Sequence, residues 1–283
     1  MSILLAALLG LIQGLAEFLP ISSSGHLNLL QALFNLDLEH QLLFNILLHV
    51  GSLMAVLIVF WKDWLQMVLH PIRNKTLLLL VIASLPALVA KLALGDTLDY
   101  LETHNALLGV CFLFTGLLLM LTQWFSRRNQ LAGQEQSQVG VFHALAMGCM
   151  QAIGMLPGIS RSGSTIFGGV AVKLDRQTAA KFSFMMSMPA IVASFLSEGY
   201  SAYKQGAFSQ SADLVPIVVG MVVAGVVGYL SIRFMLRIIA RISLNWFALY
   251  VIVLGIVVLV LQAAGVIVDA PVPAAAAAFA PLL

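Results

Sequence analysis

Long apolar segments dominate this sequence and restrict what it can fold into. Six of them come close to the length of about 20 residues that a helix needs to cross the hydrocarbon core of a bilayer. These segments are 41–60, 76–94, 105–125, 178–198, 214–232 and 245–265. Because 61% of the residues are hydrophobic and only 9% are charged, we expect an all-α polytopic membrane protein and exclude a soluble domain. The net charge of +2, without a basic tail, excludes nucleic acid as a partner.

Polar residues interrupt the apolar pattern between Gln13 and His26, where the sequence reads QGLAEFLPISSSGH. A polar group buried in hydrocarbon is costly without a partner or water, so such a cluster marks a functional site in a membrane protein. Gln13 and Glu17 lie four residues apart on one helical face, and Pro20 ends that helix before a serine-rich loop. We therefore expect residues 1–35 to form a helix-loop-helix hairpin that enters the membrane and returns to the same side.

A second stretch repeats this pattern between residues 139 and 173. A half-helix is predicted to end at Leu156, followed by a break at Pro157 and Gly158 and by the loop SRSGST before the chain returns. Irregular backbone survives in a membrane only when it is buried in protein or faces a watery cavity. The sequence thus predicts two re-entrant hairpins in addition to six transmembrane helices.

The two stretches belong to an internal repeat with an offset of 138 residues. Identical residues at this offset include the pairs Gly10 and Gly148, Gln13 and Gln151, Ser22 and Ser160, Ser24 and Ser162, and Gly25 and Gly163. The halves, residues 1–138 and 139–283, each contain one hairpin and three transmembrane helices, and an odd number of crossings turns the second half upside down. We therefore predict an inverted repeat whose hairpins enter from opposite faces and meet inside the protein, with Ser23 opposite Arg161.

Basic residues orient this arrangement across the membrane. Lys and Arg concentrate in the loops 61–75, 126–138 and 233–244, whereas the loop 95–105 is acidic. By the positive-inside rule, the three basic loops face the cytoplasm and the acidic loop faces outside. Both chain ends are then predicted to lie outside.

Arg161 is the one arginine at the centre of either predicted hairpin. Its neighbours are small hydroxyl residues and glycine, namely Ser160, Ser162, Gly163 and Thr165. A guanidinium fork matches phosphate oxygens, and backbone N–H groups at a helix start add partial positive charge. This pattern predicts a phosphate site in which these four neighbours bind substrate. The alternative is a structural arginine that pairs with Glu17 across the hairpins.

The first hairpin contains groups suited to chemistry on such a phosphate. Glu17 could hold a divalent cation or act as a general base, with Gln13 as an orienting donor, and the alternative for Glu17 is an ion pair only. The three serines Ser22, Ser23 and Ser24 could bind substrate or cap the following helix. Either Ser23 or His26 is expected to be the nucleophile, with the other as its proton partner, and the sequence leaves the choice between them open.

Other polar residues have structural interpretations. Asp37 and Asp175 occupy matching positions just before transmembrane segments, which is typical of helix caps. Asn45 and His49 lie one turn apart within a transmembrane segment, and we expect them to form hydrogen bonds between helices.

Two of these motifs resemble a known family. QGLAEFLPISSSGH at 13–26 resembles the first motif of the bacterial undecaprenyl-diphosphate phosphatases of the bacitracin-resistance (UppP/BacA) type, and LPGISRSGST at 156–165 resembles their second. FNILLHVGS at 44–52 and KFSFMMSMPA at 181–190 extend the resemblance over essentially the whole chain.

The resemblance implies hydrolysis of undecaprenyl diphosphate to undecaprenyl phosphate and phosphate, which recycles the lipid carrier for cell-wall synthesis. It further implies a divalent cation, Mg²⁺ or Ca²⁺, and a multi-pass protein of the bacterial plasma membrane whose active site opens to the outer side. Family roles carry over to four catalytic residues, Glu17, Ser23, His26 and Arg161, with Glu17 also as metal ligand. The first position of the family's E/Q-x-x-x-E pattern is Gln13 here, which leaves Glu17 as the single carboxylate of the hairpin.

The expected partners are therefore a polyprenyl diphosphate lipid and membrane lipids, while a homodimer is left open. The rival hypothesis is a transporter or flippase of a polyprenyl phosphate lipid, because inverted repeats with broken helices are common in transporters and a phosphate site serves either activity. Ser23 and His26 favour an enzyme, since carriage alone needs no nucleophile.

Overall fold

The structure is a computed structural model that describes residues 1–34, 41–70, 74–103, 105–204 and 214–267. Within these ranges the chain forms eleven helices and no β-strand, which confirms the expected all-α fold. The helices are α1 (Ile3–Phe18), α2 (Ser23–Leu33), α3 (Gln41–Val59), α4 (Trp61–Leu69), α5 (Lys75–Thr103), α6 (Leu108–Leu131), α7 (Val141–Ile153), α8 (Arg161–Ala171), α9 (Arg176–Lys204), α10 (Leu214–Ile238) and α11 (Asn245–Ala263).

Every predicted transmembrane segment falls on one long helix. By length and composition α5, α6, α9, α10 and α11 can each cross a membrane, and α3 with α4 adds a sixth span if this bent pair is counted as one. The chain is thus a multi-pass membrane protein. The transmembrane segment in α5 was expected to end at Leu94, whereas α5 continues to Thr103. The backbone is nevertheless non-helical at Leu94, with φ −126° and ψ 17°.

The first basic loop differs from the prediction. Residues 61–69, expected in a loop, form α4, which leaves α3 at an angle of 76°. Trp61, Leu65 and Val68 on α4 are exposed, whereas Met67 is buried. Exposed apolar side chains on a short helix that turns away from a span are typical of a position along the membrane surface.

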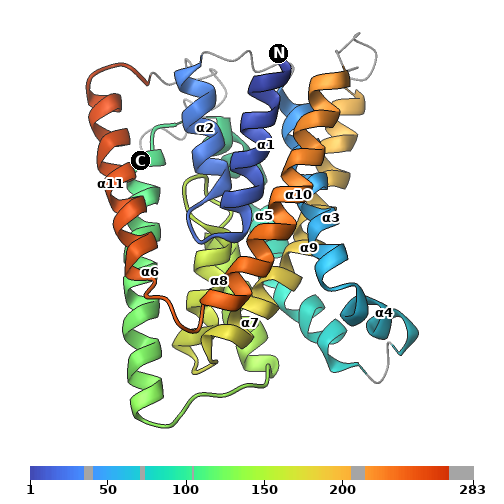
Figure 1. Cartoon of the computed structure of the whole chain (residues 1–283), viewed down its shortest axis with the longest axis vertical. Helices are drawn as coiled ribbons and strands as arrows, with labels where there is room; N and C mark the ends of the chain where they lie inside the picture. Colours follow the sequence, from blue (N-terminus) through green and yellow to red (C-terminus); the bar gives the residue numbers. More distant parts are fainter. Residues whose placement is uncertain (35–40, 71–73, 104, 205–213, 268–283) are drawn as a thin grey trace.

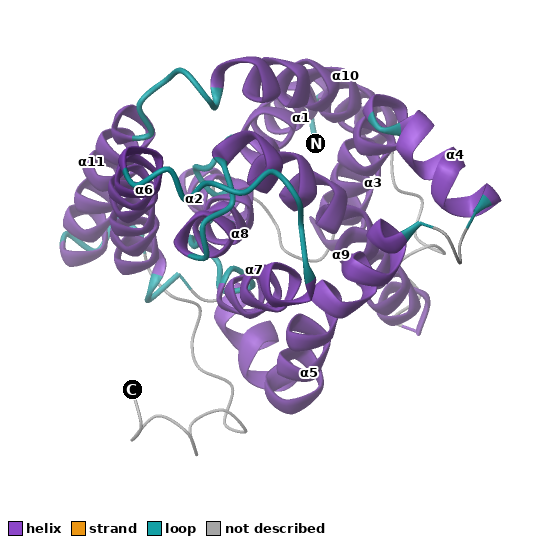
Figure 2. Ribbon diagram, turned by 90° about the horizontal axis from the view of Figure 1, so that it is seen from below, coloured by secondary structure: helices purple, strands orange, loops and turns teal. Residues whose placement is uncertain are grey.

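Two pairs of short helices form hairpins that point toward each other (Figure 1). α1 and α2 reach the middle of the molecule from the end where the chain starts, and α7 and α8 reach it from the opposite end, near α4. The helices are interrupted at residues 19–22 in the first hairpin and 154–160 in the second. Viewed from below, α2 and α8 lie inside the bundle, with α6 and α11 on one side and α3, α9 and α10 on the other (Figure 2).

Equivalent helix starts support the predicted repeat, which stays a prediction. α2 begins at Ser23 and α8 begins at Arg161, which are the two residues expected opposite each other. Each helix is capped by the preceding serine, because Ser22 accepts from the backbone N–H of Gly25 at 3.3 Å and Ser160 accepts from that of Gly163 at 3.1 Å. The same capping interaction thus occurs at two positions that are 138 residues apart, as the repeat predicts.

Each hairpin packs closely on a long helix from the other half of the chain. α1 contacts α10 and α7 contacts α5. A Cβ atom on Gly10 would overlap the carbonyl oxygen of Gly220, and one on Gly148 would overlap that of Ala83. Because apolar burial does not drive helices together within lipid, van der Waals contacts between closely spaced helices matter, and small residues allow that close approach.

Asp175 is confirmed as a helix cap. Its carboxylate accepts from the backbone N–H of Thr178 at 2.9 Å and from the Thr178 hydroxyl at 2.7 Å at the start of α9. Asp37, the matching predicted cap, lies outside the described residues.

Candidate active site

The two hairpins touch at their interrupted tips. The Ser162 hydroxyl donates to the carbonyl oxygen of Leu19 at 3.2 Å. A Cβ atom on Gly25 would lie 2.9 Å from the Cα atom of Gly158, so a side chain at Gly25 would push the tips apart. The polar residues of both hairpins therefore belong to one site, although they are far apart in the sequence.

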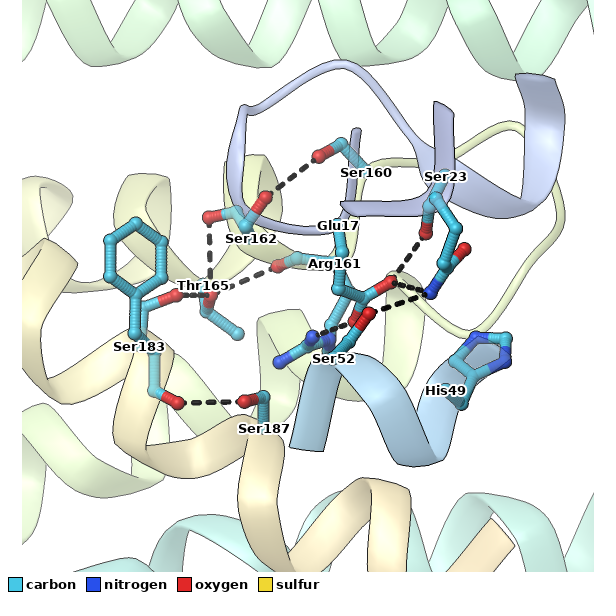
Figure 3. A network of polar contacts seen from close by, with 12 residues as sticks. Glu17, Ser23, His49, Ser52, Ser160, Arg161, Ser162, Thr165, Ser183 and Ser187 are labelled. Atoms are coloured by element: carbon cyan, nitrogen blue, oxygen red, sulfur yellow. Dashed lines mark hydrogen bonds and ion pairs between the residues drawn. The ribbon is translucent and has the colours of Figure 1, made fainter. Parts of the chain in front are cut away.

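The Glu17 carboxylate is the centre of this site (Figure 3). Its Oε2 atom accepts from the Ser23 hydroxyl at 2.6 Å and from Gln13 Nε2 at 3.1 Å. Its Oε1 atom is paired with the guanidinium of Arg161. Glu17 is only 7% exposed, and a carboxylate this deeply buried is stable because these donors surround it.

Arg161 forms the ion pair that was the structural alternative for this residue. Nη2 makes the contact with Glu17, and within the described part of the chain the other guanidinium nitrogens have no hydrogen-bond partner. The side chain keeps 17% of its surface exposed and projects from the first residue of α8, next to that helix N-terminus. Donors remain free for an anion, so the predicted phosphate role is compatible with the pair and stays a prediction.

The hydroxyl residues near Arg161 stabilise the second hairpin. Ser160 caps α8, and its hydroxyl lies 3.2 Å from that of Ser162. The Thr165 hydroxyl is 2.9 Å from the carbonyl oxygen of Arg161 and 2.6 Å from the hydroxyl of Ser183 on α9. A Cβ atom on Gly163 would lie 3.2 Å from Ser160, so this turn is tight. These contacts are structural, and the predicted substrate contacts of these residues stay predictions.

The three serines of the first hairpin have different surroundings. Ser22 caps α2 with φ +71°, a left-handed conformation that is unusual for a residue with a side chain. Ser23 donates to Glu17, whereas half-buried Ser24 has no hydrogen-bond partner among the described residues. Of the three, Ser23 is the one whose hydroxyl proton faces a base.

Ser23 and His26 are not hydrogen-bonded to each other, so their expected pairing as nucleophile and proton partner is not formed directly in the described structure. Nδ1 of His26 lies 2.7 Å from the carbonyl oxygen of Ser22, and Nε2 lies 2.7 Å from the hydroxyl of Tyr250 on α11. The imidazole is therefore turned toward α11. The acceptor for the Ser23 proton is Glu17.

Helix α3 contributes residues that the sequence did not assign to the site. The buried Ser52 hydroxyl lies 3.4 Å from Gln13 Nε2, and His49 lies beside this cluster (Figure 3). The signal was available, because Asn45, His49 and Ser52 share one helical face within FNILLHVGS. The predicted interhelical bond of Asn45 is confirmed by Gln31 Nε2 at 3.0 Å, whereas His49 donates within α3 to the Asn45 carbonyl at 2.8 Å.

The oxygen atoms of the first hairpin fit a divalent cation shared with a phosphate ligand. Among the described residues, no three His, Cys, Asp or Glu side chains come together as a metal cage. However, Gln13 Oε1 is buried next to Glu17 without a hydrogen-bond partner in the described structure, which leaves a carbonyl oxygen for a ligand. Mg²⁺ and Ca²⁺ prefer oxygen ligands, and Mg²⁺ is often held by one or two protein groups together with substrate phosphates.

Sequence comparisons agree with this arrangement. The family described as "Bacitracin resistance protein BacA" matches residues 6–257. An undecaprenyl-diphosphatase of Carboxydothermus hydrogenoformans is 40% identical over 260 residues, which cover 92% of this chain and 97% of that protein. Undecaprenyl-diphosphatase 3 of Bacillus cereus is 38% identical over 257 residues, which cover 91% of this chain and 96% of that protein. An undecaprenyl-diphosphatase of Thermodesulfovibrio yellowstonii is 34% identical over 257 residues, which cover 90% of this chain and 96% of that protein. The chain therefore belongs to the BacA family of bacitracin resistance proteins.

Proposed function

We propose that this protein is an integral membrane phosphatase that hydrolyses undecaprenyl diphosphate to undecaprenyl phosphate and inorganic phosphate. The relatives that match 92% and 91% of this chain are named undecaprenyl-diphosphatases. The observation that carries the proposal is the hydrogen bond from Ser23 to Glu17, whose carboxylate is also paired with Arg161. In the proposal these three residues are the nucleophile, the base and the phosphate-binding cation. A nucleophile hydrogen-bonded to a base is the arrangement that covalent catalysis requires.

The geometry favours Ser23 over His26 as the nucleophile. In the first step, Ser23 Oγ forms a bond to the terminal phosphorus and its proton passes to Glu17, 2.6 Å away. The bond between that phosphorus and the bridging oxygen breaks, and undecaprenyl phosphate leaves. Water then attacks the phosphorus of the phosphoserine, and the bond between that phosphorus and Ser23 Oγ breaks. Glu17 returns its proton to Oγ, and phosphate leaves with the oxygen and the protons of the water. His26 is hydrogen-bonded to Ser22 and Tyr250 and not to Ser23 or Glu17, and we assign it proton transfer rather than attack.

Arg161 changes partner when substrate binds. A diphosphate carries more negative charge than one carboxylate, so its oxygens compete with Glu17 for the guanidinium. Arg161 then neutralises the charge that develops on the phosphoryl oxygens, in a site where few water molecules screen the interaction. Glu17 keeps its hydrogen bond to Ser23 and acts as the base for that hydroxyl.

A divalent cation is part of the proposal. Glu17 and the free carbonyl oxygen of Gln13 would hold it, and when bound it would neutralise phosphate charge and act as a Lewis acid. The substrate places its prenyl chain among the helices, and the active site serves the outer side of the bacterial plasma membrane. The names of the relatives do not favour the rival hypothesis of a polyprenyl phosphate transporter.

Phosphate release from undecaprenyl diphosphate by purified protein in detergent tests the proposal. We expect turnover with Mg²⁺ or Ca²⁺, little turnover in a chelator and recovery when the cation is restored. Ser23→Ala should lose turnover. Ser84→Ala should keep it, because the Ser84 hydroxyl donates to the Leu80 carbonyl of its own helix and has no other hydrogen-bond partner in the described part of the chain. Lipid binding without any phosphate release by the wild-type protein would contradict an enzymatic function.

A further inference from the structure

The imidazole of His26 makes four contacts with three residues, and two of these contacts come from Tyr250 on α11. Nδ1 is 2.7 Å from the Ser22 carbonyl oxygen, and Nε2 is 2.7 Å from the Tyr250 hydroxyl. The Phe112 ring meets the imidazole edge-on at 5.4 Å between centroids, and the Tyr250 ring lies nearly parallel to it at 5.7 Å with an interplanar angle of 13°. Rotation of the ring by half a turn would break both hydrogen bonds, so the ring has one orientation.

The two hydrogen bonds also define where the ring proton lies. A carbonyl oxygen only accepts, so the Nδ1 atom facing Ser22 must carry a proton. In a neutral imidazole the other nitrogen is then an acceptor, and the Tyr250 hydroxyl is the donor that matches it. His26 is thereby held as the neutral tautomer with its lone pair on Nε2, which is the form that can accept a proton in turnover.

Tyr250 lies on α11, a helix long and apolar enough to cross a membrane, and the residue is 47% exposed. A hydroxyl at such a position favours a protein partner over hydrocarbon, and here that partner is His26. His26 precedes Tyr250 by 224 positions in the sequence. The contact joins α11 to the hairpin that contains Ser23 and Glu17.

We propose that Tyr250 is a positioning residue for His26: its hydroxyl fixes the imidazole ring with Nε2 unprotonated and in a single orientation. The role of Tyr250 in turnover rests on the proposed phosphatase function. The protonation pattern of the His26 ring does not depend on that function. Tyr250 acts through His26 and does not itself contact substrate.

Steady-state phosphate release by Tyr250→Phe tests the role in turnover. Phenylalanine keeps the stacked ring and removes only the hydroxyl, so kcat should fall by roughly tenfold while KM stays close to wild type. Tyr229→Phe is the matched control, because the hydroxyl of Tyr229 on α10 accepts from Arg233 at 2.6 Å and has no hydrogen bond to either hairpin among the described residues. Unchanged kcat in Tyr250→Phe, or a change confined to KM, would overturn the proposal.

A double-mutant cycle separates positioning from a general structural effect. If Tyr250 acts through His26, Tyr250→Phe should cause no further loss in a His26→Ala background. An equal loss in both backgrounds would show that Tyr250 acts elsewhere and would overturn the proposal.

Nitrogen NMR of ¹⁵N-histidine-labelled protein in detergent gives a readout without turnover. The His26 signals, identified by their loss in His26→Ala, should show a protonated Nδ1 and an unprotonated Nε2 in the wild-type protein. The Nε2 signal should shift in Tyr250→Phe, because its hydrogen-bond donor is gone, and stay unchanged in Tyr229→Phe. A proton on Nε2 of the wild-type protein, or an unchanged signal in Tyr250→Phe, would overturn the proposal. Failure of phosphate release with the expected NMR pattern would instead count against the phosphatase function.

Discussion

Glu17 and Arg161 form an ion pair that joins two hairpins, although 144 residues separate them in the sequence. Glu17 lies in the last turn of α1 and Arg161 is the first residue of α8, so the pair exists only because both hairpins end in the middle of the molecule (Figure 1). The same carboxylate accepts the Ser23 proton. The Glu17 side chain therefore both connects the two hairpins and takes part in the proposed chemistry.

Glu17→Gln should lose most turnover and also lower the thermal stability of the protein. The amide cannot take the Ser23 proton, and it leaves a guanidinium with only 17% of its side chain exposed without a charged partner. Phosphate release and the melting temperature in detergent are the two measurements. Asp63→Asn is the control, because it breaks the exposed ion pair with Lys181, whose side chains are 36% and 49% exposed, and such pairs contribute about 1 kcal/mol or less. Full activity of Glu17→Gln in a chelator would remove both proposed roles of Glu17.

Arg161→Lys should reduce kcat by roughly tenfold or more, which corresponds to about 1.4 kcal/mol of lost transition-state stabilisation. Lysine keeps the charge but loses the planar fork that matches phosphoryl oxygens, and Arg161→Ala should fall further. Steady-state phosphate release is measured after each variant has been shown to be folded. If Arg161→Lys raised only KM, Arg161 would act in substrate binding and not in the transition state.

Labelling of single cysteines tests the predicted orientation. In a protein with Cys111 and Cys149 replaced by alanine, Ser137→Cys lies in the exposed segment after α6, and Ala264→Cys is exposed just after α11. If the basic loops face the cytoplasm, a membrane-impermeant thiol reagent should label Ala264→Cys in intact cells and should label Ser137→Cys only after the cells are opened. Labelling of Ser137→Cys but not of Ala264→Cys in intact cells would show that the orientation is opposite to the predicted one.

Gly148→Ala should destabilise the protein by roughly 1–3 kcal/mol, because the added methyl group overlaps the backbone of α5 at Ala83. Gly199→Ala in α9 is the matched control, since no atom lies within 4 Å of a Cβ there and alanine is the better helix former. Thermal unfolding of both variants in detergent is the measurement. If Gly148→Ala and Gly199→Ala had equal melting temperatures, α7 and α5 could move apart without a loss of stability.

Much of the architecture follows from the sequence because its causes are local. The length of each apolar segment predicts a span. Pro20 and Pro157 predict the interruptions because a loop rich in serine and glycine follows each of them, whereas Pro86 and Pro189 lie within α5 and α9. The caps at Ser160 and Asp175 follow in the same way, because a cap involves residues only three positions away. The sequence did not predict α4, because its nine residues are shorter than a span and its residues read equally well as a charged loop.

The sequence by itself therefore determined the membrane class, the two interrupted hairpins, the residues at their tips and the family resemblance. Only the tertiary structure decided which of these residues are partners: Ser23 with Glu17 rather than His26, and His26 with Tyr250. The physical reason is that these contacts depend on the packing of whole helices. Apolar helix faces that cross a membrane are chemically alike, so their order in the sequence does not indicate which neighbours they will meet.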